Sequence, residues 1–220
     1  ISNYTLMNGD LVAFGILVFT SFFTLINPLG TMPVFMTMTG QLNEHERGKT
    51  ALKAVLVAFL TLLLFAFSGN LLFDFFGISL NSLRMVGGVI FFIMGMDMLQ
   101  ARLASTKVTG DEVKEYVNDI SVTPLGIPMI CGPGAITNAI VLMRDTGNYS
   151  EKAVLISVMA FVLLITYLVL LSSSKILKVI GNTGNKVMMR LMGLIVMVIA
   201  VEFFFSGLKP VLIDIIQAAN

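Results

Sequence analysis

The stretch Thr123–Asn138, which reads Thr-Pro-Leu-Gly-Ile-Pro-Met-Ile-Cys-Gly-Pro-Gly-Ala-Ile-Thr-Asn, decides how the rest of the chain is interpreted. It is apolar enough to enter a bilayer, yet its three prolines and three glycines disfavour an uninterrupted helix. Backbone that leaves helical geometry at membrane depth is tolerated only where protein buries it or where it lines a wet cavity, because lipid offers no hydrogen-bond partners. We therefore expect a broken helix and a functional site here.

Composition places the whole chain in a membrane. Hydrophobic residues make up 56% of the 220 residues and charged residues only 12%, which is far from the usual balance of a soluble domain. The single histidine and the absence of a His/Cys/Asp cluster with ligand spacing argue against an enzyme, a metal or a cofactor. The formal net charge of +1 gives no indication of a nucleic-acid partner.

Six apolar runs are long enough to cross a bilayer, which takes about 20 residues of helix. They are Leu11–Thr39, Ala51–Phe76, Leu80–Gln100, Ser121–Met143, Ala153–Leu171 and Val187–Leu208. The sequence thus predicts an all-α membrane protein with one transmembrane domain, residues 1–220. A charged loop at about 101–120 separates two halves of three runs each, at about 11–100 and about 121–208.

The distribution of Lys and Arg predicts the orientation in the membrane. One side would carry ten of them: Arg47, Lys49, Lys53, Arg102, Lys107, Lys114, Lys175, Lys178, Lys186 and Arg190. The other side would carry four: Arg84, Arg144, Lys152 and Lys209. We expect the first side to be cytoplasmic, with both termini on the outer side of a plasma or inner membrane.

The two halves repeat a series of features in the same order. Asn27-Pro-Leu-Gly30 is followed by Arg84-Met-Val-Gly87 and Asp97, and Thr123-Pro-Leu-Gly126 is followed by Arg190-Leu-Met-Gly193 and Glu202. Because each half has an odd number of spans, the second would cross the membrane in the opposite sense, giving an inverted-topology repeat with broken helices in spans 1 and 4. The alternative is chance recurrence in an apolar sequence of low diversity.

The breaks in spans 1 and 4 supply the candidate binding residues. Asn27-Pro28 and Thr123-Pro124 each have the pattern of an N-cap followed by proline at the first helical position, and Gly132-Pro133 is a further start. Free amides at such half-helix N-termini bind anions such as carboxylates. The candidate substrate-binding residues, which fit a compact zwitterion, are Asn27, Pro28, Gly30, Thr31, Thr123, Pro124, Gly126, Gly132, Pro133, Gly134, Ala135, Thr137 and Asn138.

Two acids within the spans are candidates for binding a coupling proton or sodium ion. Asp97 lies in the third run and Glu202 in the sixth, and charged side chains inside a membrane are costly and usually functional. The alternative is that both side chains reach the interface, because each lies near a helix end.

Other functions remain open at this point. The prolines could only kink helices and the glycines only allow close helix packing, which would suit a membrane scaffold that transports nothing. A channel would need a continuous polar lining, which no run displays.

Several motifs are similar to the signature of the MarC family of prokaryotic inner-membrane proteins. They are Asn27-Pro-Leu-Gly30 with Pro33 and Phe35, Pro124-Leu-Gly-Ile-Pro128 and Gly132-Pro-Gly-Ala-Ile136. The likeness extends over essentially the whole chain, including the six spans. It implies transport of small neutral amino acids such as glycine, alanine, serine and threonine.

Overall fold

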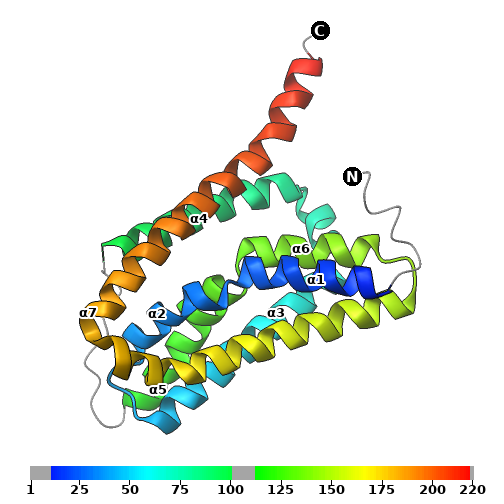
Figure 1. The fold of residues 1–220 in the computed structure, drawn as a ribbon. Helices are drawn as coiled ribbons and strands as arrows, with labels where there is room; N and C mark the ends of the chain where they lie inside the picture. Colours follow the sequence, from blue (N-terminus) through cyan, green and yellow to red (C-terminus); the bar gives the residue numbers. More distant parts are fainter. Residues whose placement is uncertain (1–10, 101–111, 219–220) are drawn as a thin grey trace.

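The computed structural model describes residues 11–100 and 112–218, and the regular structure in these ranges is helical (Figure 1). The elements in chain order are α1 (Leu11–Ile26), α2 (Pro28–Met38), α3 (Glu44–Phe76), α4 (Leu80–Leu99), α5 (Glu112–Ile120), the irregular helical segment η2 (Ser121–Ile130), α6 (Pro133–Asp145) and α7 (Tyr149–Ala218). The prediction of an all-α membrane protein is confirmed.

The membrane-crossing helices match the predicted runs in number once a bent span is included. Within the described residues, five helical stretches are long and apolar enough to cross a bilayer. They are Leu11–Met38, Glu44–Gly69, Leu80–Leu99, Tyr149–Ile176 and Thr183–Gln217. The pair Val113–Ile130 and Pro133–Asp145, bent by 61° at its break, gives a sixth if it is taken as one span.

Two intervals between the predicted runs are partly helical. The interval between the first two predicted runs contains the first turns of α3, which begins at Glu44. The Asn43 side chain accepts a hydrogen bond from the Glu46 backbone amide, and the Glu46 carboxylate accepts one from the Asn43 backbone amide. This capping box satisfies two amides that would otherwise lack partners. Likewise, α5 occupies 112–120 of the predicted charged loop, and residues 101–111 lie outside the described part.

The interval at 172–186, between the fifth and sixth predicted runs, is helical except at one glycine. Gly181 has φ 64° and ψ 179°, a backbone conformation that glycine adopts without steric cost. It divides α7 into a first arm, residues 149–180, and a second arm, residues 182–218, which turns sharply away from the first (Figure 1). The second arm extends past Leu208, the predicted end of the sixth run.

Helix α4 and the second arm of α7 pack backbone to backbone and run side by side in Figure 1. A Cβ atom built on Gly88 would lie 2.7 Å from the carbonyl oxygen of Ala200, and one built on Gly207 would lie 2.5 Å from that of Asn81. Only small residues permit such an approach, which is common where helices meet in membranes. The other helices, with the first arm of α7, form the remaining body of the molecule.

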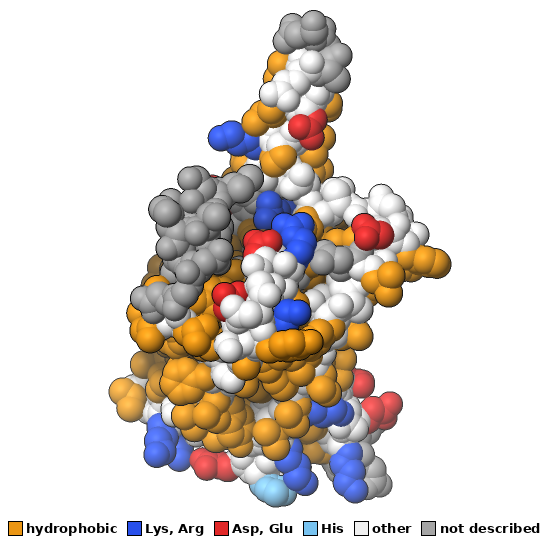
Figure 2. Space-filling model, turned by 90° about the vertical axis from the view of Figure 1, so that its right-hand side faces the viewer, with side chains coloured by type: hydrophobic (Ala, Val, Ile, Leu, Met, Phe, Trp, Pro, Cys, Tyr) orange, Lys and Arg blue, Asp and Glu red, His pale blue; other side chains and the backbone are white. Residues whose placement is uncertain are grey.

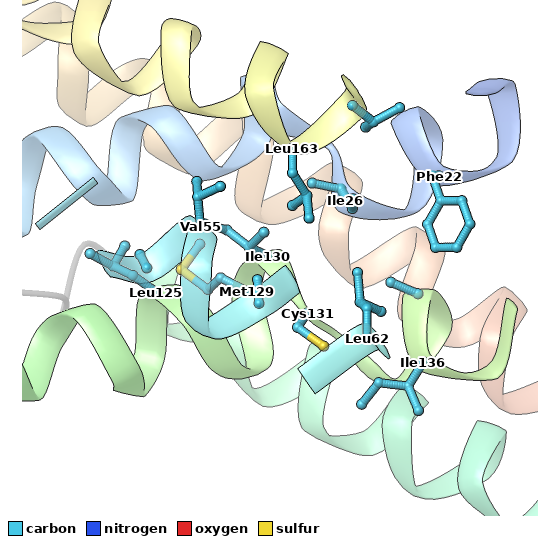
Figure 3. Close-up of a cluster of buried hydrophobic side chains, with 14 of the residues drawn as sticks. Phe22, Ile26, Val55, Leu62, Leu125, Met129, Ile130, Cys131, Ile136 and Leu163 are labelled. Carbon is cyan, nitrogen blue, oxygen red and sulfur yellow. The ribbon is translucent and has the colours of Figure 1, made fainter. Parts of the chain in front are cut away.

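Apolar side chains fill the centre of this body and cover its outside. Phe22 of α1, Leu62 of α3 and Leu163 of α7 gather around Ile130 and Cys131, which precede α6 (Figure 3). On the outside, an orange band of hydrophobic side chains lies between charged side chains at the bottom of the view and a second charged group above it (Figure 2). A band of this kind is the surface that lipid tails cover.

Candidate functional site

The first helix break lies at Asn27. Its backbone is left-handed (φ 46°, ψ 68°), and its side-chain Oδ1 accepts a hydrogen bond of 3.1 Å from the Gly30 amide. Asn27 is therefore the N-cap of α2 and Pro28 is the first helical residue, as the Asn-Pro pattern predicts. The Thr31 hydroxyl donates to the Asn27 carbonyl at 3.3 Å, which ties the first turn of α2 to the break.

The second break lies between η2 and α6. Gly132 is extended (φ −81°, ψ 166°) and precedes Pro133, the first residue of α6. The predicted helix start at Gly132-Pro133 is confirmed. Unlike Asn27, Gly132 has no side chain with which to cap the amides at the beginning of α6.

The predicted N-cap at Thr123 is wrong. Thr123 and Ile127 lie inside η2, and each is extended, with φ near −132° and ψ near 125°. Each precedes a proline, Pro124 or Pro128, whose ring disfavours helical geometry in the residue before it. Two prolines four residues apart therefore distort η2 along its length, and the new helix begins only after Gly132.

A small cavity of about 40 Å³ lies beside the first break. It is bounded by α1, the start of α2, α4, the second arm of α7 and Met129 of η2. Its lining residues are Thr24, Leu25, Ile26, Asn27, Gly30, Thr31, Phe91, Met94, Met98, Met129, Val196, Ile199 and Phe203. Because about 10–15 Å³ of such space holds one water molecule, the cavity is on the scale of a few waters. We call it the central cavity.

The second break lies directly behind the wall of the central cavity. The ring of Phe91, a wall residue, packs on the Cα of Gly132. A Cβ atom built on Gly134 would lie 3.0 Å from a methyl carbon of Leu25 and 3.1 Å from the ring of Phe203, two further wall residues. The N-terminus of α6 is therefore separated from the cavity by single side chains.

Other candidate residues lie away from the cavity. Thr123 is exposed and Pro124 half-buried, while Gly126 packs on α3, where a Cβ atom would lie 3.3 Å from the carbonyl oxygen of Ala54. The Asn138 amide donates to the Ser21 hydroxyl at 3.3 Å and so joins α6 to α1. The structure thus brings Asn27, Gly30 and Thr31 together in the cavity, and Gly132 and Gly134 to its wall.

Three candidates at the start of α6 and α2 are buried. Pro28, Pro133 and Ala135 lie in the protein interior, and Pro133 packs on the Cα of Gly87 of α4. Thr137, which ends the first turn of α6, is 3% exposed, and its hydroxyl has no hydrogen-bond partner within the described residues. An unpaired buried hydroxyl is unusual and calls for a ligand or water as its partner.

The two candidate acids do not line the central cavity. Asp97 is half-buried in α4, whereas Glu202 is exposed on the second arm of α7. Residues 11–100 and 112–218 contain no group of three or more His, Cys, Asp or Glu side chains that could hold a metal ion.

Sequence reasoning missed most of the cavity wall. Phe91, Met94 and Met98 of α4 face Val196, Ile199 and Phe203 of α7 across it. In an apolar sequence these residues look like lipid-facing or packing residues. The one signal that marks them is a constant separation, since each residue of the first trio precedes its counterpart in the second by 105 positions (196 − 91, 199 − 94 and 203 − 98).

Comparison with known proteins gives one family. The sequence model described as "MarC family integral membrane protein" matches residues 12–212. A protein named "UPF0056 membrane protein" from Methanocaldococcus jannaschii is 36% identical over 200 residues, which cover 90% of this chain and 97% of that protein. One from Bacillus subtilis is 37% identical over 195 residues, covering 87% and 92%. No solved structure matches the chain.

Proposed function

Because the chain belongs to the MarC family of integral membrane proteins, we propose that it is a secondary transporter of small neutral amino acids, resident in the plasma or inner membrane with both termini outside. The observation that carries the proposal is the central cavity, which lies beside the helix break at Asn27 and is lined by residues from both halves of the chain. Secondary transporters bind substrate at such breaks, at the interface of their repeats.

The repeat that we propose has a register of about 105 residues. Asn43 caps α3 by accepting from Glu46, and Asn148 caps α7 by accepting from Glu151, with both members of the pair 105 positions apart (148 − 43 and 151 − 46). Asn27 and Gly132 precede half-helices that begin with proline, again 105 apart (132 − 27). Since each half has three spans, the halves would be inverted relative to each other.

The same register supports a functional role for the central cavity. The three wall pairs of α4 and α7 follow it, and so do Thr24 and Met129 (129 − 24). A cavity lined by equivalent residues from both halves would lie on the axis that relates them. Rocking of one half against the other around this axis would expose the cavity to each side in turn.

The polarity of the helix ends around the cavity suits a zwitterion. Thr24, Leu25 and Ile26 form the last turn of α1, whose carbonyl groups carry the negative end of the helix dipole, and all three line the cavity. They would hold the ammonium group. The uncapped N-terminus of α6, with its positive end and the free Thr137 hydroxyl, would hold the carboxylate.

The size of the cavity favours small substrates. At about 40 Å³, it has space for only a few water molecules, so a substrate would have to be small and Phe91 and Phe203 would have to move aside to admit it. Movement of these two rings would also join the cavity to the N-terminus of α6. A substrate with a large side chain would have no space between the closely packed backbones of α4 and the second arm of α7.

Uptake by proteoliposomes tests the proposal. We expect labelled glycine or alanine to accumulate in a saturable way when a proton or sodium gradient is imposed, with Asp97 or Glu202 as the coupling group. Absence of uptake under every imposed gradient would exclude transport. Non-saturable flux would instead indicate a channel.

A further inference from the structure

A second cavity lies outside the proposed transport site, between the start of α3 and α5. Its volume is about 500 Å³. Its lining residues are His45, Glu46, Lys49, Leu52, Lys53, Leu56, Val113, Lys114, Val117 and Asn118. We call it the basic groove, because three lysines line it against a single carboxylate.

The basic groove continues a surface that faces lipid. Leu52, Leu56, Leu60 and Leu64 are all exposed and recur every four residues along one face of α3, which is the pattern of a helix side covered by lipid tails. Towards the N-terminus the same face continues into Lys49. The polarity therefore changes from hydrocarbon to cation where α3 leaves the bilayer.

The chemistry of the two walls is complementary to a phospholipid. Lys49 and Lys53 of α3 stand opposite Lys114 of α5, and the Lys53 ammonium donates to the Asn118 amide oxygen at 2.6 Å, which holds the walls together. The carboxylate of Glu46 is engaged by the Asn43 amide at 3.1 Å and belongs to the helix cap. The groove thus offers cations to a headgroup and Leu52 and Leu56 to an acyl chain.

We infer that the basic groove binds one phospholipid with an anionic headgroup, its phosphate among Lys49, Lys53 and Lys114 and an acyl chain along Leu52 and Leu56. Basic pockets at the ends of membrane helices recognise anionic lipids by this combination of charge and apolar surface. Lysine contributes a flexible point charge, which suits a phosphate diester of variable headgroup. The inference is independent of the substrate of the central cavity.

Fluorescence quenching by brominated lipid tests this site directly, because the chain has no tryptophan. A Leu56→Trp variant places one fluorophore at the groove, and Leu64→Trp places one on the same lipid-facing stripe, about 12 Å further along the helix. Each is reconstituted in phosphatidylcholine vesicles with a minor fraction of brominated phosphatidylglycerol or brominated phosphatidylcholine. We expect phosphatidylglycerol to quench Trp at 56 preferentially, and the two lipids to quench Trp at 64 equally.

Neutralising the lysines should abolish the preference. In the Leu56→Trp background, K49Q, K53Q and K114Q should each lower the relative affinity for phosphatidylglycerol about fivefold. A matched triple change, K175Q, K178Q and K186Q, removes three exposed lysines elsewhere and should leave it intact. Equal quenching at 56 by the two lipids, equal preference at 56 and 64, or a preference that survives loss of the groove lysines would overturn the inference.

One further measurement distinguishes binding of a lipid from binding of a free phosphate. Excess glycerol phosphate in the buffer should not change the quenching at 56, because a soluble ion cannot use the apolar half of the groove. Full loss of the preference on its addition would identify a phosphate site instead and contradict the assignment to lipid. The comparison of positions 56 and 64 uses protein with all its lysines, so it stands even if a lysine variant fails to fold.

Discussion

Gly95 of α4 and Gly193 of α7 each lie against the other's backbone. A Cβ atom built on Gly95 would lie 2.8 Å from the carbonyl oxygen of Gly193, and one built on Gly193 would lie 2.7 Å from the carbonyl oxygen of Gly95. The two backbones are therefore in direct contact here, with no side chain between them. Under the register of 105 residues, the contact of Gly193 with Gly95 is also the counterpart of the contact of Gly88 with Ala200 (193 − 88 and 200 − 95).

A methyl group at Gly193 should force the two helices apart. We expect Gly193→Ala to lower the unfolding free energy by about 2 kcal/mol, because backbone atoms of Gly95 and Leu99 cannot yield to the added carbon. In a thermal melt of the purified protein this corresponds to a drop of about 4–8 °C. Gly15→Ala is the matched control, since its Cβ would meet only a methyl group of Val154 at 3.6 Å. Equal melting temperatures for the two variants would contradict the interpretation.

Asn27 combines a left-handed backbone with a capping side chain, and two substitutions separate these contributions. Asn27→Gly removes the cap but keeps the backbone conformation unstrained, at a cost of a few tenths of a kcal/mol. Asn27→Ala also places a Cβ in left-handed geometry and should be less stable than the glycine variant by about 1–2 kcal/mol. Thermal unfolding of both variants measures the difference. An alanine variant as stable as the glycine variant would mean that the break relaxes to ordinary helix.

The helices were predictable because the membrane imposes their length and composition. The runs Ala51–Phe76 and Leu80–Gln100 end at or beside the ends of α3 and α4. The helix start at Asn27 was also predictable, since an Asn-Pro pair predicts both the N-cap and the first helical residue. The turn at Gly181 was not, because one residue with positive φ suffices to reverse the chain where a polar interval suggested a loop.

The second half of the candidate site was harder to predict, because two similar sequence motifs adopt different backbone conformations. Pro28-Leu-Gly and Pro124-Leu-Gly read alike, yet Pro28 begins a helix whereas Pro124 lies inside η2. Under the proposed register of 105 residues, the counterpart of Asn27 is Gly132, which has no capping side chain. The residue types of apolar wall residues such as Phe91 carry no signal, since burial in a cavity wall and exposure to lipid favour the same side chains. Only their constant separation of 105 positions from residues of the second half marks them.

Filling the space at Gly134 should stop transport while the protein stays folded. A Cβ atom there touches Leu25 and Phe203, whose flexible ends can shift by a few tenths of an ångström, but a valine would also project carbons between the central cavity and the amides of α6. We expect uptake of labelled glycine to fall in the order wild type, Gly134→Ala, Gly134→Val, with the last close to background. A melting temperature near that of wild type shows that the fold survives. Full uptake by the valine variant would show that the substrate binds elsewhere in the protein.

The free hydroxyl of Thr137 allows binding to be separated from stability. Valine has nearly the same shape, and replacing an unpaired buried hydroxyl by a methyl group removes a desolvation cost, so Thr137→Val should melt at the wild-type temperature or above it. If the hydroxyl donates to the substrate carboxylate, uptake should nevertheless fall by about tenfold or more, because a hydrogen bond to a charged group contributes about 1.5–3 kcal/mol. Thr166→Val is the control, since its buried hydroxyl already donates to the Val162 carbonyl at 2.9 Å and faces no cavity residue in the proposed site. A Thr137→Val protein that is destabilised and transports normally would show that the hydroxyl has a structural partner and no role in binding.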